Sequence, residues 1–228
     1  MTAISGPTPA PTEPAAPDTP THFAGPDLPA PHDPAGPYGV VMVCTGNICR
    51  SAMAHAVLVD RLAAAGIPSY PGGVAVTSAG VSDEEAGNPM DPRAQRVLSE
   101  AGYGGGGDAA SRAVMAVISQ HAAHRISDTE LRRADLVLAM TAAHHRALTR
   151  RAAGLDVDPG RILMYRQFDP TAPAGPTTTA TPASPSSLDV PDPWYGTLAD
   201  FLYTLDVVER VSDALTPKLA RLAAEFAQ

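Results

Sequence analysis

Residues 43–51 of the sequence read VCTGNICRS, and they lie between a short apolar run and an Ala-rich stretch. The apolar run, GVVMVC at 39–44, is typical of a buried strand in a parallel sheet. Residues 50–66 repeat apolar side chains at helical spacing and end at a glycine. A strand, a tight loop and a helix in this order place the loop at the carboxyl edge of an open α/β sheet, where such folds bind ligands.

Strands and helices continue to alternate along the rest of the chain. The sequence predicts further strands at 73–78, 135–140 and 161–165. It predicts further helices from Pro92 to Gly102, from a Thr141 cap to about Arg151, and over 197–227, the last as one helix or as two divided at Pro217. This alternation predicts an α/β fold, a four-stranded parallel sheet with helices on both faces in a flavodoxin-like three-layer sandwich.

Three stretches do not fit the alternation. Residues 1–37 hold eleven prolines and are predicted to be a disordered tail before a folded domain at 38–228. The tail is either a solubilising segment or a docking site for a proline-recognising partner, and the first interpretation is favoured. The stretches near 104–120 and 170–187 are predicted to be surface insertions.

Composition and charge exclude several classes of function. The net charge is −8, which argues against binding to nucleic acid. No run of about 18 apolar residues could span a membrane, and the N-terminus lacks the basic and apolar segments of a secretory signal. Two cysteines five positions apart form neither a disulfide framework nor a zinc site, so a reducing compartment, the cytoplasm, is expected, with no metal or cofactor.

The loop at 43–51 has the chemistry of a phosphate site. Free amide groups at the start of the helix favour an anion in the loop. The same field should keep Cys44 largely as thiolate, a nucleophile for phosphoryl transfer. Arg50 can hold two phosphate oxygens, Gly46 and Asn47 suit a left-handed backbone, and Ser51 can donate a hydrogen bond to the sulfur.

The run C-T-G-N-I-C-R-S resembles the C-x-G-N-x-C-R-S signature of the low-molecular-weight protein tyrosine phosphatases. Four further segments resemble family segments in family order: VTSAG (76–80), NPMDPRA (88–94), DLVLAM (135–140) and DVPDPWYG (189–196). The resemblance implies hydrolysis of phosphotyrosine in protein substrates through a phosphocysteine on Cys44. It also implies that the loop binds the substrate through Thr45, Gly46, Asn47, Ile48, Cys49 and Ser51.

The resemblance identifies Asp192, in the DVPDPWYG segment, as the general acid that protonates the leaving phenolate and later as the base. Its apolar neighbours would keep part of it protonated. Asp189 is the less favoured alternative acid. Trp194 and Tyr195 match the family's aromatic pair and are expected to wall the phenyl ring, unless they only pack the loop onto the domain.

Four residues match the side chains that hold the family's loop by hydrogen bonds: Asn47, Ser51, Ser78 and His121. His124 competes with His121 for that alignment. The pair at 144 and 145 is interpreted as two surface histidines of a helix.

Two features leave alternatives open. Cys49 either fills the base of the loop as a small apolar residue or forms a reversible disulfide with Cys44, as the family precedent favours. The acidic segment 82–85 either favours substrates with basic neighbours or leaves a more open pocket. Two other functions remain possible on this scaffold, an arsenate reductase and a phosphate-binding module without turnover, but the first needs cysteines outside the loop, which this chain lacks.

Overall fold

The computed structural model describes residues 25–68, 73–173 and 185–226. Its centre is a four-stranded sheet in the order β2-β1-β3-β4, with every neighbouring pair parallel. The strands are β1 (Tyr38–Cys44), β2 (Val74–Gly80), β3 (Leu136–Ala139) and β4 (Ile162–Met164). All four predicted strands are therefore confirmed, with ends that differ by at most two residues.

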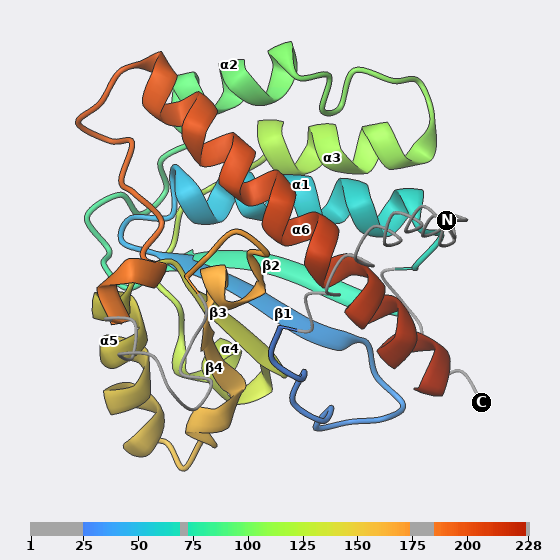
Figure 1. Ribbon diagram of the computed structural model, residues 1–228, viewed down its shortest axis with the longest axis vertical. Coiled ribbons are helices and arrows are strands. Elements are labelled where there is room, and N and C mark those ends of the chain that lie inside the picture. Colours follow the sequence, from blue (N-terminus) through green and yellow to red (C-terminus); the bar gives the residue numbers. More distant parts are fainter. Residues whose placement is uncertain (1–24, 69–72, 174–184, 227–228) are drawn as a thin grey trace, which may run out of the picture.

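Helices cover both faces of this sheet, as predicted (Figure 1). The α-helices are α1 (Arg50–Ala64), α2 (Pro92–Glu100), α3 (Ala109–Ser119), α4 (Asp128–Arg133), α5 (Ala142–Ala153) and α6 (Leu198–Phe226). Short 3-10 turns are η1 (Pro159–Arg161), η2 (Tyr165–Phe168) and η3 (Pro185–Leu188). Helices α1 and α6 pack against each other on one face, with α2 and α3 outside them, while α4 and α5 pack on the opposite face.

Strand β1 divides the core into two halves. Val40 and Met42 belong to the cluster with α1 and α6, whereas Val41 and Val43 belong to the cluster with α4 and α5. Successive side chains of a strand point to opposite faces, so a strand covered on both faces must be apolar at every position. This explains why the run before Cys44 is continuously apolar.

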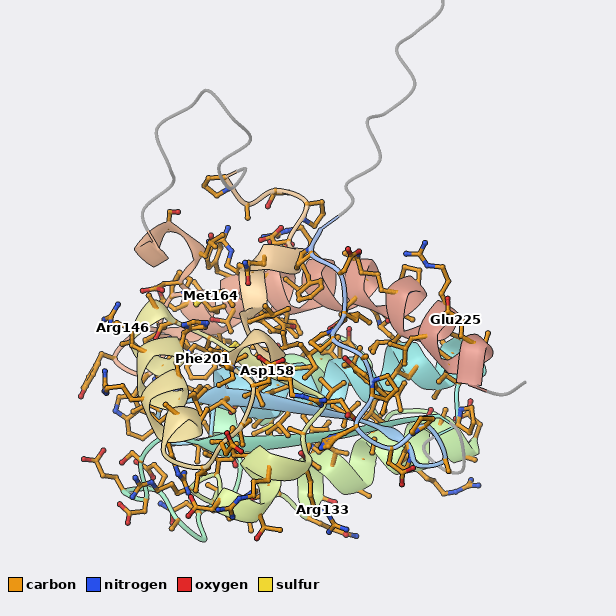
Figure 2. All side chains as sticks on the ribbon, turned by 90° about the horizontal axis from the view of Figure 1, so that it is seen from below. Arg133, Arg146, Asp158, Met164, Phe201 and Glu225 are labelled. Atoms are coloured by element: carbon orange, nitrogen blue, oxygen red, sulfur yellow. The ribbon has the colours of Figure 1, made fainter. Side chains whose placement is uncertain are left out.

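The C-terminal segment is a single helix, which decides between the two predicted forms. α6 continues through Pro217 and buries Phe201, Val208 and Leu215 against the sheet side of the molecule. Phe201 lies inside the molecule, whereas Arg146 and Glu225 lie at its edge (Figure 2). In the described part of the chain, no helix is long and apolar enough to cross a membrane.

The stretch at 104–120, predicted to be a surface insertion, is not a loop in the structure. Most of it forms α3, which is capped by Asp108 and packs on α1 through buried Val114 and Ile118. A helix rich in Ala and Val can bury an apolar face as well as one rich in Leu. The low complexity of this stretch made that face hard to recognise from the sequence. The second predicted insertion, near 170–187, lies mostly outside the described residues, which resume at η3.

Residues 25–37, predicted to be part of the disordered tail, are ordered against the domain in the structure. Residues 1–24 lie outside the described structure, but 25–37 pack along the domain. Leu28 contacts the core, the Tyr38 hydroxyl donates to the carbonyl of Pro29 at 2.9 Å, and the amide of His32 donates to Asp135 at 2.7 Å. A proline-rich segment already has a restricted backbone, so a few such contacts suffice to order it.

Candidate active site

A pocket opens where β1 ends, the point in the sheet where β2 lies on one side and β3 on the other. Its cavity volume is about 130 Å³. Six of its lining residues belong to the turn between β1 and α1, residues 44–50, here called the Cys44 loop. The opposite wall consists of Glu84, Glu85, Asp192, Trp194 and Tyr195. The fold therefore brings together the predicted nucleophile, acid, arginine and aromatic pair.

The Cys44 sulfur lies among hydrogen-bond donors. Its Sγ is 3.0 Å from Ser51 Oγ and 3.3 Å from the amide nitrogen of Asn47. Asn47 has a φ of 62°, the left-handed conformation that turns this amide toward the sulfur. A thiolate at this position would be stabilised by both donors and by the start of α1.

Asn47 connects the loop to the rest of the domain. Its Nδ2 donates to Ser51 Oγ at 3.0 Å, its Oδ1 accepts from the amide of His124 at 3.3 Å, and its carbonyl lies 2.6 Å from His121 Nε2. The last contact requires that His121 carry its proton on Nε2, and burial lowers the pKa of this histidine. The predicted contact of His121 with the loop is present, whereas His124 contacts it only through its backbone.

Ser78 differs from its prediction. It is buried at the end of β2 beside His121, but within the described structure its hydroxyl makes no hydrogen bond to the Cys44 loop. The loop is instead joined to the chain that follows β2 by backbone hydrogen bonds: the amides of Val81 and Ser82 donate to the carbonyls of Cys44 and Thr45 at 2.9 and 3.0 Å.

Gly46 has a different role from the one predicted. It is not among the residues with positive φ. A Cβ added at Gly46 would lie 2.8 Å from Cγ of Glu85, which packs directly over the loop. Glycine at this position therefore allows an acidic side chain to approach the loop closely.

The Arg50 guanidinium is buried and joins three parts of the site. Its NH1 donates to the carbonyl of Val190 at 3.2 Å, and its NH2 lies 2.6 Å from Asp192 Oδ2 and 3.4 Å from Thr45 Oγ1. Its Nε has no hydrogen-bond partner among the described residues. The Arg50 side chain is 5% exposed and that of Asp192 44%, so this ion pair lies at the boundary between the pocket and solvent.

Residues 189–196, here called the Asp192 loop, are fixed at one end by Arg93. Arg93 binds both oxygens of Asp91, the N-cap of α2, and donates to the carbonyls of Trp194 and Gly196 at 3.1 and 3.0 Å. Its guanidinium also lies 4.5 Å from the ring centroid of Phe201, within the range of a cation–π contact. Sequence reasoning did not identify Arg93, although it lies in a segment that resembles the family.

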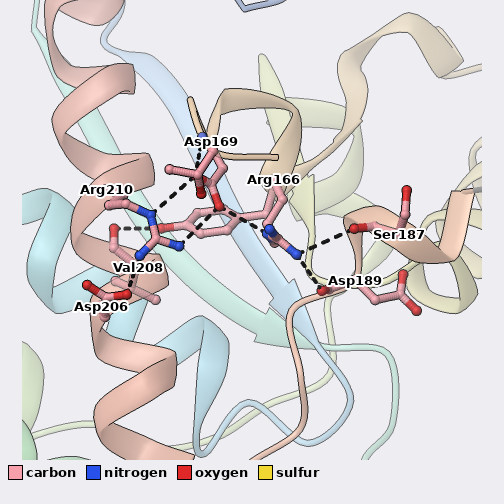
Figure 3. Close-up of polar contacts among 9 residues, drawn as sticks. Arg166, Asp169, Ser187, Asp189, Asp206, Val208 and Arg210 are labelled. Atoms are coloured by element: carbon pink, nitrogen blue, oxygen red, sulfur yellow. Dashed lines mark hydrogen bonds and ion pairs between the residues drawn. The ribbon is translucent and has the colours of Figure 1, made fainter. Parts of the chain in front are cut away.

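The other end of the Asp192 loop is fixed by Arg166 (Figure 3). Arg166 donates to the carbonyl of Asp189 at 3.3 Å and pairs with the buried carboxylate of Asp169, which Arg210 of α6 also binds. Burial would raise the pKa of Asp169, but hydrogen bonds from Arg210, Thr171 and Arg166 lower it to about 2. The Asp189 carboxylate accepts from the amide of Ala142 at 2.7 Å, so its contact is with the start of α5.

His144 is the main residue that sequence reasoning missed. The interpretation as a surface histidine is wrong, because His144 is only 6% exposed and its Nε2 lies 2.9 Å from Thr45 Oγ1. Burial and the charge of Arg50 lower its pKa to about 4. His145 is partly exposed and its Nε2 lies 2.9 Å from the carbonyl of Ile162. Its position in the sequence could have indicated this contact. His144 follows the Thr141 cap by three residues, so it lies at the edge of the sheet where the Cys44 loop also lies.

The described residues contain no group of three or more His, Cys, Asp or Glu side chains placed to hold a metal ion. Both cysteines are buried free thiols. Burial raises the pKa of Cys49 well above its ordinary value, and Cys49 is part of the core, so its packing role is confirmed. Its disulfide with Cys44 stays a prediction.

Comparison with known proteins shows similarity to one family of phosphatases over nearly the whole folded region. A family model described as low molecular weight phosphotyrosine protein phosphatase matches residues 39–226. The low molecular weight protein-tyrosine-phosphatase of Streptomyces coelicolor is 37% identical over 178 residues, covering 78% of this chain and 91% of that protein. Low molecular weight protein-tyrosine phosphatase A of Mycobacterium bovis is 33% identical over 189 residues, covering 81% and 96%. The crystal structure of such an enzyme from T. tengcongensis superposes with a TM-score of 0.58 at 28% identity, covering 79% and 98%.

Proposed function

Because the chain belongs to the low molecular weight phosphotyrosine protein phosphatase family, and is thus a protein-tyrosine phosphatase, we propose that Cys44, Arg50 and Asp192 perform its reaction. The observation that supports this assignment is their convergence. A cysteine sulfur with two hydrogen-bond donors, a buried guanidinium and a carboxylate line one pocket.

The first step transfers the phosphoryl group from tyrosine to sulfur. The Cys44 thiolate attacks phosphorus, forming an S–P bond as the P–O bond to the phenolate breaks. Arg50 and the amides of the Cys44 loop stabilise the charge on the phosphoryl oxygens. Asp192 gives its proton to the departing phenolate, whose conjugate acid has a pKa of about 10.

The second step hydrolyses the phosphocysteine. Asp192, now a carboxylate, takes a proton from water as the water oxygen attacks phosphorus and the S–P bond breaks. Ser51, with Oγ at 3.0 Å from the sulfur, stabilises the thiolate that leaves. Free phosphate is released and the starting enzyme is restored.

The Arg50–Asp192 ion pair links substrate binding to these steps. Arg50 NH2 lies 2.6 Å from the Asp192 carboxylate. A phosphate dianion competes for the same guanidinium, so its arrival releases the Asp192 carboxylate from the ion pair.

The outer pocket provides the proposed contacts with the substrate side chain. Tyr195 is 94% exposed and Trp194 37%, so both rings are accessible to a phenyl group at the pocket mouth. Ile48 and Cys49 add apolar surface at the base, while Thr45 adds a hydroxyl. These residues support the proposal that phosphotyrosine is the preferred substrate.

Trapping the intermediate tests the nucleophile. Enzyme quenched in acid during turnover of p-nitrophenyl phosphate should carry a phosphoryl adduct on Cys44 by mass spectrometry, and Cys49→Ser should retain it. Cys44→Ser should abolish hydrolysis yet still bind a phosphotyrosine peptide. Consistent labelling of another side chain, or turnover by Cys44→Ser, would refute the assignment.

Parallel assays on phosphotyrosine, phosphoserine and arsenate test the reaction class. Phosphotyrosine hydrolysis should dominate. Arsenate reduction without phosphotyrosine hydrolysis would support the reductase alternative, and phosphate binding without turnover would support a binding module.

We also propose that the enzyme acts in the cytoplasm. Its nucleophile must stay reduced, and both cysteines are free thiols in the structure. Fractionation of the producing cells with an antibody to this chain tests the location, and recovery outside the cytoplasm would contradict it.

A further inference from the structure

His144 is a buried histidine that the proposed reaction steps do not use. It lies in the first turn of α5, and its amide donates to the Thr141 cap at 3.2 Å. Its imidazole contacts the Cys44 loop through Thr45, with Nε2 2.9 Å from Oγ1. Its Nδ1 is buried and has no hydrogen-bond partner among the described residues.

The unpartnered nitrogen indicates which tautomer is present. A buried N–H without an acceptor costs more than a buried lone pair without a donor, since acceptors are more often left unsatisfied in proteins. The proton of a neutral His144 therefore belongs on Nε2, where Thr45 Oγ1 can accept it. The positive guanidinium of Arg50 also favours a bare lone pair on this ring over a second proton.

This tautomer determines what Thr45 can do. Its oxygen has two lone pairs and one proton. His144 Nε2 and Arg50 NH2, at 2.9 and 3.4 Å, both donate to it and use both lone pairs. The hydroxyl proton is the group left to donate, and Thr45 is an exposed residue that lines the pocket.

We propose that His144 is a positioning residue that fixes the Thr45 hydroxyl as a hydrogen-bond donor to the bound phosphoryl group and helps to hold Arg50 in place. It acts through Thr45 and does not contact the phosphate itself. This inference rests on the proposed role of the Cys44 loop in phosphate binding.

The two amide side chains provide a matched test. The amide nitrogen of glutamine reaches about as far as histidine Nε2, whereas that of asparagine reaches only as far as Nδ1. His144→Ala should lower kcat/KM and raise the inhibition constant of inorganic phosphate by about tenfold, the effect of losing one positioning hydrogen bond. His144→Gln should restore both to within about threefold, and His144→Asn should not. Equal behaviour of the two amide variants would overturn the proposal.

A double-mutant cycle separates positioning from general packing. In a Thr45→Val background, His144→Ala should have almost no further effect on phosphate inhibition, because the group it positions is already absent. A second tenfold loss in that background would show that His144 acts by another route. The matched control is His145→Gln in the same helix turn, which should leave phosphate inhibition unchanged because His145 contacts the carbonyl of Ile162 instead.

Nuclear magnetic resonance of the unmodified enzyme gives a test that needs neither turnover nor a folded variant. Long-range proton–nitrogen spectra should show the His144 imidazole protonated only at Nε2 at pH 7, with that proton coupled through the hydrogen bond to Thr45. A buried His144 protonated at Nδ1 would refute the proposal. If the tautomer is as expected but no phosphocysteine forms on Cys44, the reaction proposal fails while the positioning geometry stands.

Discussion

Acidification from pH 7 to pH 5 should destabilise the folded chain through His55. This histidine lies on α1 and lines a cavity of about 220 Å³ together with Ser78 and His121. Burial and the nearby His121 lower its pKa from 6.5 to about 4. Between pH 6.5 and about pH 4, His55 is therefore protonated in the unfolded chain but not in the folded chain.

The size of the effect follows from that difference. A group whose pKa is lower in the folded state opposes folding as the pH falls below the unfolded value. Between pH 7 and pH 5, a shift from 6.5 to about 4 reduces the free energy of unfolding by about 2 kcal/mol. His144 has a similar shift and should contribute a similar loss. Asp169 keeps its charge in the folded state down to its pKa of about 2, and its contribution to stability falls only below about pH 4, outside this window.

Urea unfolding at pH 7 and pH 5, followed by circular dichroism at constant ionic strength, measures this loss. His55 and His144 together should cost the parent about 4 kcal/mol, and His55→Gln should remove about 2 kcal/mol of that loss. The His55→Gln/His144→Gln double variant should keep only the loss that comes from the remaining groups, chiefly His121, whose pKa burial also lowers. The reasoning is refuted if His55→Gln loses as much stability as the parent over the same pH range. It is also refuted if the parent is equally stable at both values.

Three further outcomes are expected. Asp192→Asn should slow phenyl phosphate far more than p-nitrophenyl phosphate, because the nitrophenolate needs less protonation to depart; equal slowing in steady-state assays would exclude Asp192 as the acid. Charge reversal at Glu84 or Glu85, which line the pocket, should raise the affinity for phosphopeptides with acidic neighbours, measured as KM against a peptide with basic neighbours. No change would show that these carboxylates do not contact the flanking residues. Asp169→Ala should cost about 3 kcal/mol in urea unfolding, because it leaves Arg166 and Arg210 without their buried partner; an unchanged midpoint would contradict that role.

The sheet and the Cys44 loop could be predicted because their signals are local. A continuously apolar run identified β1, and a dense cluster of special residues identified the turn after it. The prediction that Asp192 lies near that turn rested on the resemblance to a family, because no local pattern in the sequence indicates it. The structure explains why Asp192 lies there, since Arg50 contacts both Asp192 and the carbonyl of Val190.

The misses share a physical cause, which is dependence on tertiary partners. His144 has the sequence environment of a surface helix residue, but in the folded domain it is buried and contacts Thr45. Helix α3 is rich in Ala and Val, and its apolar face can be recognised only from its packing, in which α1 covers Val114. His32 is ordered by Asp135, which is 103 positions away in the chain. None of these contacts has a signature within a short window of sequence.

The salt bridge between Arg50 and Asp192 also has a consequence for how the enzyme is handled. Anions in the buffer can bind the Arg50 guanidinium in place of Asp192, so they affect the phosphatase activity that is measured. Sulfate and chloride at equal ionic strength should leave different fractions of molecules with a free carboxylate. Rates measured in different buffers therefore describe different starting populations, and comparing initial rates in the two salts reveals the difference.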